Sequence, residues 1–168
     1  MAYSLSQASL PVFAIGLDAL SAVLGKAEAF AQAKKIDPAV LLASRLAPDM
    51  FALARQVQLV SDHAKNGAAR LAGVEPPRFE DNEKTMEELR ARIAKAIDYL
   101  KSIPAGALEA SEERDIKVPA GERTLEFKGL VFLQRWAIPN VFFHITTAYN
   151  ILRHNGVDIG KRDYLGSP

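Results

Sequence analysis

The chain has 168 residues, with 21 basic and 20 acidic side chains, and no cysteine. A net charge of +1 leaves no excess of positive charge for binding nucleic acid or an anionic membrane, and without cysteine there are no disulfides, thiolate nucleophiles, zinc knuckles or iron–sulfur clusters. The apolar share of 49% and the charged share of 24% are typical of a soluble globular protein, and the length favours one domain over residues 1–168.

The N-terminal region carries neither a signal peptide nor a membrane span by its residue pattern. The first basic residue is Lys26, so the positive start of a signal peptide is missing. The longest uncharged run ends at Leu17, before Asp18, and is too short and too weakly apolar to cross a bilayer. We therefore expect a cytoplasmic protein that has no membrane partner.

The first helix is predicted from apolar residues at alternating intervals of three and four. They are Leu10, Phe13, Leu17, Leu20 and Leu24. Pro11 fits best inside the first turn of this helix. Asp37 and Pro38 then predict an N-cap and a first helical position, and Pro48 is expected to break or restart that segment.

The second and third long helices follow the same rule. Helical spacing runs from Leu53 to Leu71 and ends at Gly73, a C-terminal cap, after which residues 73–77 form a linker. Thr85 to Glu88 matches a capping box at the start of the third helix, in which Glu88 and Arg92 suit an exposed ion pair. The apolar face of this helix comprises Leu89, Ile93, Ile97 and Leu100, and Pro104 and Gly106 end it.

A β-hairpin and a fourth helix complete the prediction. The charge-rich residues 109–117 favour a solvated loop. Alternating apolar residues on both sides of residues 119–121 predict a short hairpin, so that residues 114–128 hold the only β structure. Residues 129–155 return to helical spacing, with a kink or reset expected at Pro139. The fold class is therefore all-α, a four-helix bundle with a short β-hairpin between the third and fourth long helices.

The histidines are the candidate site. His144 lies about 80° from the middle of the apolar stripe of the last helix, on a flank that it shares with Asn140 and Thr147. His63 lies close to the inward seam of the second helix. We expect His63 and His144 to approach each other in the bundle interior and to line a ligand pocket with Asn140 and Thr147. The alternative is that both are core histidines with satisfied hydrogen bonds. His154 is about 15 Å from His144 along the helix and is expected to stay apart, at the helix C-terminus.

Other features bear on partners and chemistry. The chain has no glycine-rich phosphate loop after a strand, no G-x-S-x-G elbow and no basic residues interleaved with exposed aromatics, so no nucleic-acid partner is expected. Aromatic residues surround much of the last helix, which favours a homodimer unless the hairpin covers them. They are Phe132, Trp136, Phe142, Phe143 and Tyr149.

Three stretches carry a resemblance to a known superfamily: "SLPVFAIGLDALSAVL", "MFALARQVQLVSDHAKNGAARLAG" and "FFHITTAYNILRHNGVDIGKRDYLG". The chain resembles the DinB/YfiT-like superfamily, and within it a bacterial domain-of-unknown-function branch, over nearly its whole length. The resemblance implies a DinB-like four-helix bundle. Many members of the superfamily hold a divalent metal with one histidine of the second helix and an H-x-x-x-H pair of the last, so the resemblance also implies a metal site.

Residue by residue, the resemblance places His63 and His144 at two positions of that metal site. The partner of His144 is missing, because Ala148 stands four residues after it and Asn140 four residues before it. Two histidines and an amide fall short of the three good ligands of a catalytic metal, so we expect an incomplete metal site and no cofactor. The alternative is weakly bound zinc, nickel or iron, with Asp62 a doubtful further ligand because it points about 100° away from His63.

Three functional hypotheses follow. The first is a binding or regulatory bundle whose degenerate metal site has become a pocket for an unknown small molecule. The second is a divalent-metal-dependent enzyme that resembles the thiol transferases and isomerases, or a hydrolase-like enzyme, in which the ion activates a thiol or water. The third is a bundle whose buried histidines bind no ligand. The sequence names no substrate.

Overall fold

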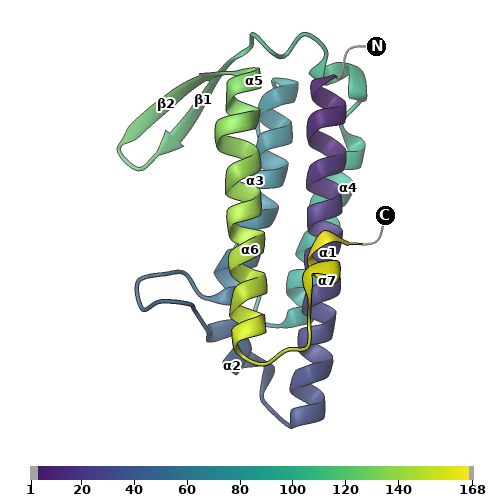
Figure 1. The fold of residues 1–168 in the computed structure, drawn as a ribbon. Coiled ribbons are helices and arrows are strands. Elements are labelled where there is room, and N and C mark those ends of the chain that lie inside the picture. The colour runs from purple at the N-terminus through teal and green to yellow at the C-terminus, as the bar shows by residue number, and fades with distance from the viewer. Residues whose placement is uncertain (1–3, 167–168) are drawn as a thin grey trace.

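Four long helices lie side by side and enclose the apolar side chains (Figure 1). The computed structural model describes residues 4–166. The elements in chain order are α1 (Leu5–Lys34), α2 (Pro38–Ala43), α3 (Leu53–Ala72), α4 (Met86–Ser102), the 3₁₀ turn η1 (Ala105–Leu108), β1 (Asp115–Ala120), β2 (Arg123–Lys128), α5 (Gly129–Phe132), the π turn η2 (Leu133–Ala137), α6 (Ile138–His154) and α7 (Lys161–Leu165). The predicted all-α bundle with one hairpin is confirmed.

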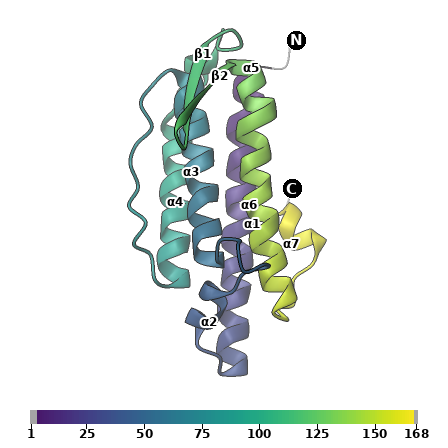
Figure 2. The same ribbon diagram turned by 90° about the vertical axis from the view of Figure 1, so that its left-hand side faces the viewer.

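The helices do not simply alternate in direction. α1 and α6 run one way, and α3 and α4 run the other way (Figure 1). α3 and α4 are parallel because residues 73–85 return along the bundle, as Figure 2 shows. The predicted linker of residues 73–77 is therefore too short. Five residues reach at most about 18 Å, whereas a helix as long as α4 is about 25 Å.

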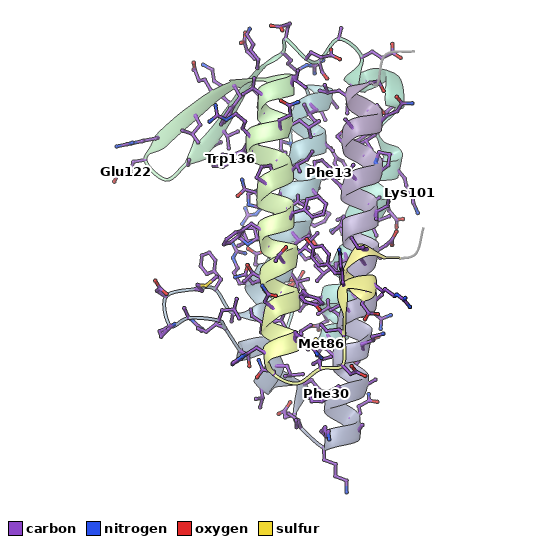
Figure 3. All side chains as sticks on the ribbon, in the orientation of Figure 1. Phe13, Phe30, Met86, Lys101, Glu122 and Trp136 are labelled. Carbon is purple, nitrogen blue, oxygen red and sulfur yellow. The ribbon has the colours of Figure 1, made fainter. Side chains whose placement is uncertain are left out.

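α1 begins earlier than predicted. Ser4 and Gln7 form a capping box, in which the Gln7 N–H donates to the Ser4 hydroxyl over 3.2 Å. Pro11 consequently lies beyond the first turn, on the exposed side of the helix, and its predicted position is wrong. The predicted inward face is confirmed from Phe13 onwards, and Phe13 lies between the long helices in Figure 3.

By length and composition α1 is the one helix of the described residues that could cross a membrane. An 18-residue window of it has a mean hydropathy of 1.7. The expectation that the N-terminal region is too weakly apolar for a span does not hold for this helix as a whole. Within the bundle 44% of that window is buried, and both core helices of soluble proteins and signal sequences reach this length and hydropathy.

The segment from α2 to α3 largely follows the prediction. The Asp37 carboxylate accepts the backbone N–H of Ala39 over 2.9 Å, and Pro38 is the first residue of α2. α2 ends at Ala43, before Pro48, and residues 44–52 form a loop. α3 ends at Gly73 in the left-handed conformation with φ of 74°, so the predicted cap is confirmed.

α4 has the predicted capping box of Thr85 and Glu88, but not the predicted ion pair. Arg92 is only 4% exposed and pairs with Asp62 of α3 and with Asp81 and Glu83 of the 73–85 segment. The Glu88 carboxylate instead accepts the backbone N–H of Thr85 at the N-terminus of the helix. The expected exposed pair is therefore wrong, because the returning segment covers this face of α4.

The hairpin has the predicted register. Ile116 faces Phe127 and Val118 faces Leu125 across the two antiparallel strands. Phe127 packs against Trp136, with ring centroids 5.9 Å apart, and Figure 3 shows Trp136 beside the hairpin and Glu122 at its tip. The hairpin therefore covers aromatic surface at the start of the last long helix.

The last long helix is reset before Pro139, as predicted. The N–H of Ile138 donates to the carbonyl of Leu133, which widens the backbone into the π turn η2. Proline has no N–H and crowds the preceding turn, so a widened turn lets the helix continue past it. At the other end His154 is the last residue of α6, as predicted, and Gly156 follows in the left-handed conformation with a φ of 89°.

The aromatic residues of this helix were expected to form an uncovered strip, and most of them are covered instead. Phe132 is buried and Trp136 packs under the hairpin, whereas Tyr149 meets Tyr164 of the C-terminal segment with ring centroids 5.8 Å apart. The C-terminal segment is held to α1 by the ion pair of Lys26 with Asp163, which is 2.6 Å long. Phe143 alone of the strip stays largely exposed, at 56%.

Gly129, the first residue of α5, offers a test of this packing. A Cβ atom added there would collide with the backbone carbonyl oxygen of Ser111. We expect Gly129→Ala to lower the free energy of unfolding by about 1–3 kcal/mol, measured by urea denaturation. Gly106→Ala is the control, because an added Cβ meets no atom within 4 Å, and its effect should stay within about 0.5 kcal/mol. Equal stability of the two variants would contradict the close contact.

Candidate functional site

His63 of α3 and His144 of α6 meet face to face. Their ring centroids are 5.3 Å apart and the ring planes differ by 12°. His144 is 8% exposed, and His63 is partly buried. The prediction that these two rings approach each other is confirmed, and His154 is exposed at the far end of α6. Two imidazoles from helices far apart in sequence thus form one stacked pair.

Gln56 of α3 orients His144. The Gln56 amide nitrogen donates to the carbonyl of Phe51 over 3.1 Å, which leaves its Oε1 facing His144 Nδ1 at 2.7 Å. Because this oxygen only accepts, His144 Nδ1 carries the proton and Nε2 keeps its lone pair. Sequence reasoning missed Gln56. Gln56 could have been found from its position seven residues before His63, because this spacing places the two residues on one face of α3.

Both imidazoles are held in the neutral form. Burial lowers the pKa of His63 from 6.5 to about 4, and the neighbouring His144 acts in the same direction, whereas Asp62 opposes it. Burial also lowers the pKa of His144 to about 4, with a smaller contribution from the positive charge of Arg55. At neutral pH the pair therefore offers uncharged imidazole donors and acceptors.

Asn140 and Thr147 bond to the backbone of their own helix. Asn140 Nδ2 donates to the carbonyl of Trp136, and Thr147 Oγ1 donates to the carbonyl of Phe143, each over 2.7 Å. Such bonds to a carbonyl four residues earlier are common for short polar side chains inside helices. Their predicted part in a ligand pocket stays a prediction, and the structure places only the two histidines in contact.

The exposed phenyl ring of Phe143 borders the histidine pair, and the backbone carbonyl of Phe51 is linked to the pair through Gln56; we call Phe51 and Phe143 the aromatic rim. Phe143 meets the His144 ring edge-on at a centroid distance of 5.2 Å, and Phe51 is tied to His144 through Gln56. The rim residues are 57% and 56% exposed. Two cavities, of about 520 and 460 Å³, lie elsewhere, beside Phe79 and on the hairpin.

The donor set does not fit a catalytic metal ion. The described residues contain no group of three His, Cys, Asp or Glu side chains arranged to hold a metal. The Asp62 carboxylate, the nearest acid in sequence, binds Lys65 and Arg92, each at 3.0 Å. Imidazole lone pairs lie in the ring plane, and two nearly parallel planes do not converge on one ion about 2 Å from each nitrogen.

Comparisons with known proteins agree with this fold. The family model of a domain of unknown function, DUF1993, matches residues 5–165. The crystal structure of a DinB family member from Shewanella denitrificans matches with a TM-score of 0.92 and 46% sequence identity, over 98% of this chain and 93% of that one. No curated protein matches this chain. The chain belongs to the DUF1993 family, a DinB-like branch of helical bundles.

Proposed function

We propose that this protein is a binding or regulatory bundle that recognises a small molecule at the stacked pair of His63 and His144. The observation that carries the proposal is the pair itself: two neutral imidazoles, stacked at 5.3 Å, of which His144 is oriented by Gln56. A neutral imidazole offers one donor and one acceptor, and the free Nε2 of His144 is the acceptor here. Holding that nitrogen in one tautomer suits the recognition of a hydrogen-bond donor.

The surroundings indicate the kind of ligand. Phe143 of the aromatic rim supplies exposed apolar surface next to the imidazole of His144, a common composition for small-molecule sites. Burial lowers the pKa of both histidines and the positive charge of Arg55 adds to this, so the site disfavours a cationic ligand. We therefore propose a flat, uncharged or weakly acidic molecule that has a hydrogen-bond donor for the imidazole and an apolar part for the rim.

The metal-dependent alternative lacks support from the donor set. Ala148 is fully buried at the position where an H-x-x-x-H partner of His144 would stand. A metal site would need the imidazole planes to rotate and a third ligand to move in. We therefore propose binding without a resident metal, in a cytoplasmic protein, and keep self-association through the exposed Phe143 as a prediction.

The proposal is tested by NMR on the imidazole nitrogens with a library of flat heteroaromatic fragments. Fragments that bind should shift the His63 and His144 resonances. A His63→Phe/His144→Phe variant, which keeps two stacked rings but no nitrogen, should bind these fragments about tenfold more weakly, as expected for the loss of hydrogen bonds in a partly buried site.

Two outcomes would contradict the proposal. One is that the fragments bind the double variant as tightly as the original protein. The other is that protein purified without a metal-affinity tag retains about one zinc, nickel or iron per chain after dialysis, as a catalytic site would. That result would favour the metal-dependent enzyme.

A further inference from the structure

A second candidate site lies near the hairpin end of the bundle, where α3 ends and β1 begins. A cavity of about 220 Å³ opens there between the last turn of α3, the start of the 73–85 segment and residues 114–117. Arg70 of α3 and Arg114, just before β1, both line it and are both partly buried. Two arginine residues from distant parts of the chain therefore line one small cavity.

Neither guanidinium has a partner within the described residues. No hydrogen bond or ion pair joins the side chain of Arg70 or Arg114 to any of them, although the charge of Glu75, which lines the same cavity, acts on Arg70. The other charges at this cavity are occupied, because Lys117 pairs with Glu126 at 3.2 Å and Asp115 with Lys128 at 2.7 Å. Among the described residues the cavity is thus lined by two arginines whose side chains are unpaired, and by Glu75, the one lining acid without an ion pair.

Capping of α3 does not account for these arginines. The carbonyls of Ala69 and Arg70 at the end of α3 already accept the backbone N–H of Gly73. The Ala69 carbonyl also accepts the N–H of Val74, over 3.0 Å. Arg114 lies directly against Gly73, where a Cβ atom would collide with its guanidinium. The glycine therefore leaves the space in which Arg114 reaches the cavity.

The charge state points to an anion. Burial lowers the pKa of Arg70, and the negative charge of Glu75 opposes this shift only in part. The positive charge is therefore held away from water without full compensation. Guanidinium groups bind phosphate through paired, parallel N–H bonds, and two of them match the charge of a phosphate dianion. A cavity of this size suits one such group.

We propose that Arg70 and Arg114 form a phosphate-binding site in this cavity, separate from the histidine pair. Arg70 lies seven residues after His63, about 10 Å along α3. The ligand class is inorganic phosphate or a small phosphate monoester, both of which offer the same dianionic group.

The test is calorimetric titration with inorganic phosphate at constant ionic strength. We expect saturable binding, and Arg70→Gln and Arg114→Gln should each raise the Kd about tenfold, the usual loss for a charge-assisted hydrogen bond. Arg123→Gln, an exposed hairpin arginine outside the cavity, should leave the Kd unchanged. If either glutamine variant fails to fold, as judged by circular dichroism, Arg70→Lys and Arg114→Lys replace it and should weaken binding through the loss of paired N–H bonds.

Three results would overturn the proposal. The first is no saturable binding of phosphate by the unaltered protein. The second is an equal loss in the Arg123→Gln control, which would indicate general charge attraction. The third is tighter binding of acetate than of phosphate, which would assign the cavity to carboxylates. A small phosphate monoester that binds more tightly than inorganic phosphate, with the same dependence on Arg70 and Arg114, would support the site and identify the source of the group.

Discussion

Arg92→Ala is expected to lower the free energy of unfolding by about 3–5 kcal/mol, the usual cost of removing one partner from a buried ion pair. The Arg92 side chain is 2% exposed and binds Asp62 and Asp81, each at 3.0 Å, and Glu83 at 2.9 Å. Without it these carboxylates face one another without their shared cation. For a chain of this length the midpoint of thermal unfolding should fall by roughly 10 °C.

Arg90→Ala on the same helix is the matched control. Arg90 is exposed, and its guanidinium lies 3.8 Å from Glu28, so its loss should cost about 0–1 kcal/mol. Arg92→Lys should remain strongly destabilised, because one ammonium group cannot replace a planar group that binds several acceptors. If Arg92→Ala is no less stable than Arg90→Ala in urea denaturation, Arg92 does not hold the 73–85 segment to the bundle.

Stability is expected to fall as the pH decreases from about 6.5 to 4 because of the histidine pair. The pKa of both histidines drops from 6.5 to about 4 on folding. Between these values the unfolded chain binds protons that the folded chain does not, so acid favours unfolding. Above pH 6.5 this contribution is constant, and below about 4 it falls no further. After allowance for remaining solvent contact, the loss is on the order of 3 kcal/mol for the two together.

Urea denaturation over this pH range measures the effect. The His63→Phe/His144→Phe variant keeps the stacked rings but has no proton to bind at these positions, so its stability should change less between pH 6.5 and 4. Carboxylates titrate in both proteins, and the difference between the two curves isolates the histidines. Parallel curves would show that the pair is not buried in the neutral form.

Features that depend on neighbouring residues were predictable from the sequence. The capping box at Thr85, the cap at Gly73 and the hairpin register each follow from a few consecutive residues, and the structure confirms them. The helix wheels also brought His63 and His144 to the same interior, because a helix fixes which residues share a face.

Features that depend on contacts between residues far apart in the chain could not be predicted from the sequence. Arg92 reads as one half of an exposed pair on α4, and only the return of residues 73–85 over that helix buries it. Gln56 looks like an ordinary polar residue until α6 places His144 within 2.7 Å of its oxygen. The side chains of Asn140 and Thr147 could have bonded in a pocket or to the backbone of their own helix, and both donate to a carbonyl of that helix.

The most direct test of the histidine pair is an NMR pH titration of the imidazole nitrogens. We predict that both His63 and His144 change protonation near pH 4 and that His144 carries its proton on Nδ1 at neutral pH. Midpoints near 6.5 for both rings, with the proton of His144 on Nε2, would contradict a buried, stacked and neutral pair, and with it the proposed binding site.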